Sequence, residues 1–157
     1  MPQIRGWLLR VRETRAAAER SKIEFFDAGA RNLDELTTMF DELLKRKPLA
    51  LVVTAEPFTM EHRSRIVDFM VRNAIPAMFE ESRFVEAGGL MSYGPSVPDL
   101  FRRSAIYVDK ILRGANPANL PVEQPTKFEL VINRRAAKTL GITIPDSILL
   151  SADKIFE

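Results

Sequence analysis

The chain has 157 residues, the length of one ordinary domain, and 46% of them are hydrophobic, which is enough for a packed core. The formal net charge is only +2, and the basic residues alternate with acidic ones. Because they form no run and are not interleaved with aromatic residues, we expect no nucleic-acid partner. The sequence has no cysteine, which excludes disulfides, thiolate metal sites and cysteine nucleophiles.

Helical and strand-like segments alternate along the chain. Helices are predicted where apolar residues recur every three or four positions, over residues 4–21, 32–47, 59–73, 98–113 and 134–140, with a last helical turn at 144–146. Short strands are predicted in the apolar segments between them, over residues 23–26, 49–54, 75–79, 90–94 and 128–133, with an edge strand at 152–157. This alternation implies an α/β fold, in which a parallel sheet is flanked by helices.

Three segments carry more specific expectations. Asn32 with Glu35 three residues on is typical of a capping box at a helix start. The unbroken apolar run at residues 49–54 predicts a central strand buried on both faces. Residues 114–125 hold three prolines and little periodicity, so they indicate an ordered connection between substructures.

The sequence contains no recognisable catalytic constellation. His62 is the single histidine, so it cannot build a multi-histidine metal site, and no Gly-x-Ser-x-Gly elbow accompanies it. No glycine-rich phosphate loop is present, because Gly88 and Gly89 mark a turn and Gly141 a helix end. We therefore predict that the chain is not an enzyme and holds no metal or cofactor.

Polar residues follow two neighbouring predicted strands. In open parallel sheets, ligands bind outside the carboxyl ends of the strands. The carboxylates there are either solvated loop acids or recognise the ammonium group of a ligand, beside an apolar or stacking wall. Position alone does not separate these two interpretations. The strand-end residues concerned are Thr54, Glu56, Phe79, Glu80, Glu81 and Tyr93.

Three longer segments, in this order and spacing, resemble one protein family. Residues 84–95 read FVEAGGLMSYGP, residues 99–114 contain DLFRR and YVDKILRG, and residues 120–141 contain LPVEQPTKFELVIN and AKTLG. Together they resemble the ABC-type substrate-binding proteins related to tryptophan- and tyrosine-binding components. The resemblance covers essentially the whole chain.

The resemblance implies a type I periplasmic-binding-protein fold, with two α/β lobes joined by crossing hinge strands and a ligand between them. Residues 1–89 and 127–157 would form the C-terminal lobe. Residues 90–126 would be a hinge-crossing strand and helix of the N-terminal lobe, the rest of which is not in this chain. The fold is thus expected to be incomplete, with one lobe and a fragment of the other.

The function implied is the substrate-binding component of an ABC importer. The expected ligand is a small molecule such as an amino acid or related organic acid, and permease subunits are the expected partners of the full-length form. The resemblance implies a periplasmic location, although no signal peptide is visible; a genuinely short form would be cytoplasmic. The alternative is a stand-alone regulatory domain that dimerises through its incomplete lobe. From their positions at the strand ends and near the hinge, the expected ligand-binding residues are Thr54, Glu56, Phe79, Glu80, Glu81, Ser92, Tyr93 and Gly94.

Overall fold

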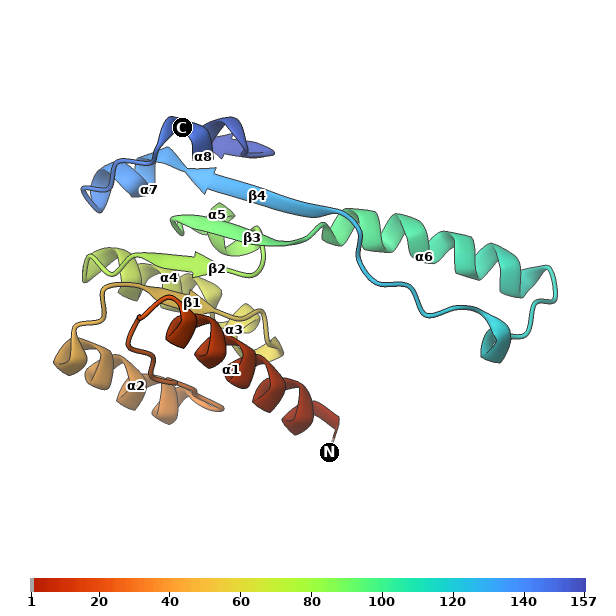
Figure 1. Cartoon of the computed structure of the whole chain (residues 1–157), viewed down its shortest axis with the longest axis horizontal. Helices are drawn as coiled ribbons and strands as arrows, with labels where there is room; N and C mark the ends of the chain where they lie inside the picture. Colours follow the sequence, from red (N-terminus) through yellow and green to blue (C-terminus); the bar gives the residue numbers. More distant parts are fainter. Residues whose placement is uncertain (1) are drawn as a thin grey trace. The chain divides into compact units, whose positions relative to one another are not determined.

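Figure 1 shows the computed structural model, which describes the backbone of residues 2–157 and the side chains from residue 9 onward. The chain divides into two compact units, Met1–Leu43 and Leu44–Glu157. The first unit holds α1 (Pro2–Arg20) and most of α2 (Leu33–Arg46). Among all the described residues of both units, no helix is long and apolar enough to cross a membrane.

The start of α2 confirms the predicted capping box. Glu35 N donates to Asn32 Oδ1 at 2.9 Å, and Arg31 N donates to Glu35 Oε2 at 2.8 Å. The orphan amide of Glu35 in the first helical turn is thereby satisfied, and the Glu35 side chain reaches back to the amide of the residue before the cap. The apolar residues that recur every three or four positions in this helix were expected to be buried; Leu36, Phe40 and Leu43 are buried, whereas Leu33 and Leu44 are exposed.

The strand predicted at residues 23–26 is wrong. The segment has no strand hydrogen bonds in the structure, and Ile23 is exposed. Ile23 N instead donates to Ala18 O at 2.9 Å, which closes the end of α1 after the left-handed Lys22. A strand needs a partner strand, and a short apolar run does not supply one.

The second unit is built on a five-stranded sheet in the order β1-β2-β3-β4-β5. Its strands are β1 (Leu51–Val53), β2 (Ala77–Phe79), β3 (Met91–Pro95), β4 (Phe128–Asn133) and β5 (Lys154–Phe156). β1, β2 and β3 are parallel to one another, β4 is antiparallel to β3, and β5 is parallel to β4. The predicted α/β class with a mostly parallel sheet is confirmed, and β5 is the edge strand predicted.

β1 is not the central strand that its apolar run predicted. Among the described residues it pairs with β2 alone, and Val52 is 67% exposed. The strand predicted at residues 23–26 would have been a candidate neighbour, and it does not form. An apolar run indicates burial, but the number of partners depends on distant parts of the chain.

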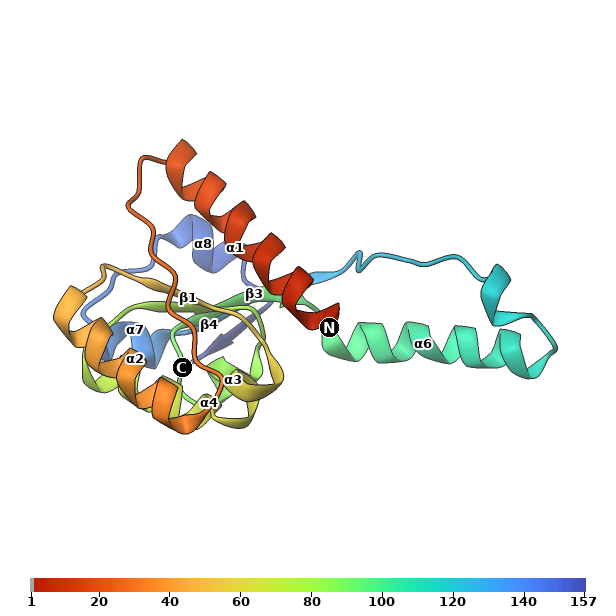
Figure 2. The ribbon, with the colours of Figure 1, turned by 90° about the horizontal axis from the view of Figure 1, so that it is seen from below.

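Helices cover the sheet and connect its strands (Figures 1 and 2). The second unit contains α3 (Pro57–Glu61), α4 (Arg63–Arg72), α5 (Arg83–Glu86), α6 (Val97–Leu112), the 3-10 turn η1 (Pro117–Asn119), α7 (Arg134–Thr139) and α8 (Asp146–Leu150). The single helix predicted at residues 59–73 is thus two helices. They break at His62, which caps α4 with non-helical dihedral angles and packs edge-on against Phe58, with ring centroids 4.6 Å apart.

Two apolar clusters hold this sheet in place. In the first, Phe79 of β2 and Phe84 of α5 stack with centroids 4.7 Å apart, and both are fully buried. Gly89 makes room for them, because a Cβ there would lie 2.6 Å from Phe79 Cε2. In the second, Leu90 packs with Ala136 and Ala137 of α7. The strand ends therefore project from a rigid frame.

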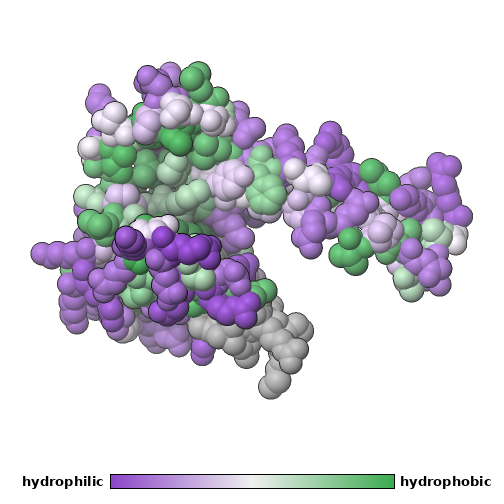
Figure 3. Space-filling model, viewed as in Figure 1, coloured by the Kyte–Doolittle hydropathy of each residue, from purple (hydrophilic) through white to green (hydrophobic). Residues whose placement is uncertain are grey.

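α6 stands apart from the sheet in both ribbon views (Figures 1 and 2). It confirms the helix predicted at 98–113, yet none of its residues is buried. Figure 3 shows its apolar side chains interspersed with hydrophilic ones along the helix. The exposed apolar residues of α6 are Leu100, Phe101, Ile106, Val108, Ile111 and Leu112.

Candidate functional site

The three parallel strands have their carboxyl ends side by side, and this row of strand ends is called the strand-end edge of the sheet. Val53 of β1 lies opposite Phe79 of β2, and Phe79 lies opposite Ser92 of β3. The residues that follow these positions therefore emerge side by side, as the sequence predicted. Since β4 runs antiparallel to β3, its first residue, Phe128, lies at the same edge, opposite Pro95.

Hydrogen bonds fix the loop that follows β1. Ala55 N donates to Glu80 Oε2 at 2.9 Å, so the loop is joined to the end of β2. Thr59 Oγ1 donates to Thr54 O at 2.7 Å, and Glu56 N donates to Thr59 Oγ1 at 2.9 Å. Glu56 also forms a capping box with Thr59 at the start of α3. Thr54 and Glu56 are thus held at a defined place beside Glu80.

The eight predicted residues divide by exposure. Tyr93 is 52% exposed, and Thr54, Glu56 and Glu80 are half-buried. These four reach the surface at the strand ends. The other four, which are buried, are Phe79, Glu81, Ser92 and Gly94.

Glu81 is bound within its own turn. Arg83 Nε donates to both carboxylate oxygens of Glu81 at 2.8 Å, and Arg83 N donates to Oε1 at 3.3 Å. The hydrogen bond to Glu81 raises the pKa of Arg83, against a smaller opposing effect of desolvation. The negative charge of Glu81 is therefore compensated by a cation of this chain.

An aromatic pair stands at the same edge. The rings of Tyr93 and Phe128 are stacked, with centroids 5.7 Å apart and 25° between their planes. Phe128 is 45% exposed, so both rings are open to a ligand. Sequence reasoning missed Phe128, because its position depends on β4 lying antiparallel beside β3. The only signal in the sequence that could have indicated its place was that this phenylalanine is the first residue of a predicted alternating strand.

The two faces of the sheet contribute differently at this edge. Residues directly opposite in an antiparallel pair share a face, and successive residues alternate. Tyr93 and Phe128 thus lie on one face, and Gly94 with Glu129 on the other. A Cβ on Gly94 would meet the peptide of Glu80, so Glu80 approaches the edge from that second face.

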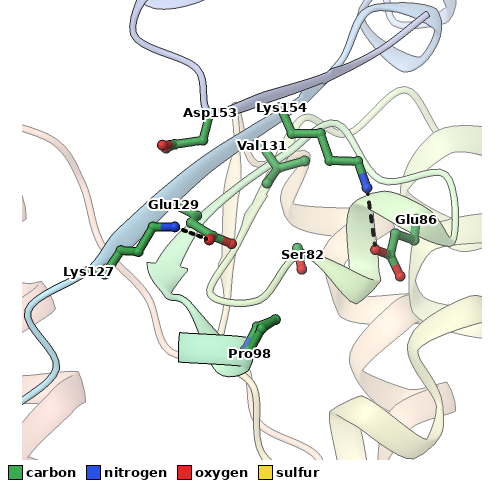
Figure 4. Close-up of a pocket in the computed structure, with 8 residues that line it drawn as sticks. All are labelled: Ser82, Glu86, Pro98, Lys127, Glu129, Val131, Asp153 and Lys154. Carbon is green, nitrogen blue, oxygen red and sulfur yellow. Dashed lines mark ion pairs between the residues drawn. The ribbon is translucent and has the colours of Figure 1, made fainter. Parts of the chain in front are cut away.

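A shallow depression of about 390 Å³ lies on the second face of the sheet (Figure 4). Its lysines face carboxylates: Lys127 Nζ is 3.3 Å from Glu129 Oε1, and Lys154 Nζ is 4.0 Å from Glu86 Oε1. Both lysines are thus paired within the chain, and the third carboxylate of the lining, Asp153, accepts from Leu130 N at 2.8 Å. The lining residues are Ser82, Glu86, Pro98, Lys127, Glu129, Val131, Asp153 and Lys154. Among the described residues, no group of three or more metal-ligating side chains could hold an ion.

Comparison with known proteins identifies the family. Residues 6–156 match the model of the ABC transporter substrate binding protein family. The chain belongs to this family. The resemblance noted in the sequence is thereby confirmed, and the family is of a substrate-binding type. Proteins of this family typically work in the periplasm or outside the cell. A search of curated protein sequences found no match.

Solved structures show the same fold. A conserved domain protein from Vibrio cholerae superposes with a TM-score of 0.85 at 23% identity, covering 94% of this chain and 50% of its own. An ABC domain from Streptococcus pneumoniae in complex with L-Trp gives a TM-score of 0.85 at 26% identity, with the same coverage of 94% and 50%. CD0873 from Clostridium difficile, a substrate binding protein with adhesive properties in a ligand-free, open structure, gives 0.67 at 20% identity, covering 96% and 50%. The chain thus spans about half the length of these relatives.

Proposed function

We propose that the chain is the ligand-binding part of the substrate-binding component of an ABC importer, with its ligand at the carboxyl ends of β1, β2 and β3. The observation that carries this proposal is the family match over residues 6–156. The strand ends support the position, because half-buried polar groups follow β1 and β2 there and a stacked aromatic pair lies on the neighbouring strands β3 and β4. Ligands of open α/β sheets bind at such edges.

The residues at this edge suit an amino acid with a planar side chain. The carboxylate of Glu56 would bind the ammonium group, since charge-assisted hydrogen bonds to carboxylates are strong. Thr54 would add a hydroxyl, and the rings of Tyr93 and Phe128 would stack on the ligand side chain. The S. pneumoniae relative is a complex with L-Trp, which favours this class. The four buried residues would support the site by packing under these side chains; they are Phe79, Glu81, Ser92 and Gly94.

A second lobe would close over this edge. Residues 1–89 and 127–157 would form one lobe, and residues 90–126 would contribute a strand and helix to the other. Two observations support this division: no residue of α6 is buried, and the solved relatives are about twice as long. The paired segments of β3 and β4 would be the hinge. Permease subunits would then receive the ligand, with the binding component in the periplasm or at the cell surface.

The exposed apolar side chains of α6 favour one alternative, a stand-alone regulatory domain that dimerises through this helix. Light scattering at several concentrations separates the two. A monomer at all concentrations contradicts the dimer, whereas a concentration-dependent dimer that Phe101→Glu abolishes supports it.

Binding of L-tryptophan tests the proposed function. Ligand-observed NMR detects complexes with millimolar dissociation constants, so it reports on the chain as it stands. We expect saturable binding, weakened roughly tenfold by Glu56→Gln, because a hydrogen bond to a charged group is worth about 1.5–3 kcal/mol. Asp68→Asn is the control, since Asp68 is an exposed carboxylate on α4. Binding that is absent, or equal in the two variants, would contradict the proposal.

A further inference from the structure

A close backbone contact joins β3 to the turn after β2. A Cβ on Gly94 would lie 1.8 Å from Glu80 O and 2.9 Å from Glu80 C. The obstacle is backbone, which cannot move aside as a flexible side chain could. The φ angle of Gly94 is not positive, so glycine is needed here for space and not for an unusual conformation. Only glycine therefore lets the Glu80 peptide cross the face of β3.

Glu80 connects this contact to the loop after β1. Its backbone N donates to Val53 O at 3.1 Å, and its side-chain Oε2 accepts from Ala55 N at 2.9 Å. Glu80, which directly follows β2, thus contacts two other strands: β3 at Gly94, and the end of β1 at Val53 and Ala55. The carboxylate is half-buried, where a hydrogen bond to a backbone amide is stronger than in water.

We propose that Glu80 is a positioning residue of the ligand site and that Gly94 holds it in place. Glu80 fixes Ala55, and so sets where Thr54 and Glu56 meet the ligand. The sequence left Glu80 either as a solvated loop acid or as a partner of the ligand's ammonium group, whereas its geometry supports a role through the loop. The effect on ligand binding rests on the proposed function, whereas the fixing of Ala55 does not.

The same contact ties the loop to the hinge-forming strand pair. Gly94 lies opposite Glu129 of β4, and α6 begins three residues after it, at Val97. A shift of β3 along its axis would therefore move the Glu80 peptide, since close-packed backbone transmits displacement. The positioning of Thr54 and Glu56 is thus linked to the strand that leads into α6.

Amide hydrogen exchange of Ala55, followed by NMR, tests the positioning role. Glu80→Ala removes the acceptor, and we expect Ala55 to exchange about tenfold faster, as loss of a hydrogen bond worth ~1.4 kcal/mol predicts. Glu80→Gln keeps an acceptor oxygen and should restore most of the protection. Glu61→Ala, an exposed glutamate on α3, is the matched control. If exchange at Ala55 is the same in Glu80→Ala as in the wild-type chain, the positioning role is refuted.

L-tryptophan affinity in the same variants separates positioning from direct contact. Positioning predicts weaker binding by Glu80→Ala and near-normal binding by Glu80→Gln. If Glu80→Gln loses affinity while Ala55 stays protected, Glu80 contacts the ligand directly and the inference is wrong. If the wild-type chain binds no L-tryptophan, the proposed function fails, and the exchange of Ala55 alone still decides the positioning of the loop.

Gly94→Ala tests the backbone contact. We expect a lower melting temperature and faster exchange at Ala55, whereas the control Gly29→Ala should change neither, because a Cβ on Gly29 meets nothing within 4 Å. Equal behaviour of the two variants would overturn the role of Gly94. If Gly94→Ala does not fold, the comparison of Glu80→Ala with Glu80→Gln decides the positioning role.

Discussion

Glu81 is the only charged residue among the described side chains that is buried, at 8% exposure. Its carboxylate is satisfied by Arg83, whose side chain is itself 55% exposed. A buried carboxylate without a partner is costly, so the pair stabilises the turn between β2 and α5. That turn also contains Glu80, and its stability therefore matters for the ligand site.

Removal of the Arg83 charge should destabilise the fold. Arg83→Met keeps the aliphatic part of the side chain but leaves Glu81 unpaired, and we expect a loss of about 1.5–3 kcal/mol in the free energy of unfolding. Arg72→Met is the control, because its ion pair with Asp68 is exposed and 3.8 Å long. Such surface pairs contribute about 0–1 kcal/mol. Urea unfolding measures both, and equal losses would contradict a special role for Arg83.

At the scale of elements, α6 is held by polar contacts and not by burial. Arg103 Nη1 donates to Thr126 Oγ1 at 2.7 Å and Arg103 pairs with Glu123, while Tyr107 Oη donates to Pro121 O at 2.8 Å. These contacts attach the helix to the returning segment 114–127. The segment predicted as an ordered connection is therefore ordered against α6.

The contact between Arg103 and Glu123 should depend on pH. The hydrogen bond from Arg103 is the largest cause that lowers the pKa of Glu123. A carboxyl whose pKa is lowered by folding contributes stability that is complete above its unfolded value of about 4.3 and is lost as pH falls through the folded value. The Glu123 carboxyl carbon, followed by NMR, should titrate below the ordinary glutamate range and return to it in Arg103→Met. An ordinary midpoint in the wild-type chain would contradict this contact.

Local patterns predicted the elements whose signals are local. The capping box of α2, the helix predicted at residues 98–113 and the alternating strand β4 all formed where the sequence indicated. The failures are non-local. Residues 23–26 do not pair with any described strand, so they form no strand. β1 was predicted as a central strand but is outermost in the sheet, because the strands beside it come from distant parts of the chain.

The proposed ligand site was predictable only in outline. A polar residue after an apolar run indicates a strand end, and Thr54, Glu56 and Glu80 do lie together at one. Which side chains face outward depends on how the chain turns over the neighbouring strand. Phe79, expected as a wall of the site, is 1% exposed and stacks on Phe84 in the core. Phe128 joins the edge through an antiparallel pairing that no short pattern encodes.

At the scale of the whole molecule, this chain of a substrate-binding family spans about half the length of its solved relatives. Its strand ends carry the groups that the proposed function uses, and α6 has exposed apolar side chains, which the proposed second lobe would cover. A single lobe contacts one side of a ligand, so we expect weak binding by this chain and tighter binding by a two-lobed protein.

The most direct test is to map where L-tryptophan binds, using amide ¹⁵N–¹H correlation spectra of the chain during a titration. Binding at the strand ends predicts progressive, saturable shifts at Ala55, Glu56 and Tyr93, with Glu86 and Lys154 of the polar depression unchanged. Shifts confined to the depression, or no shifts at millimolar ligand, would contradict a ligand site at the ends of β1, β2 and β3.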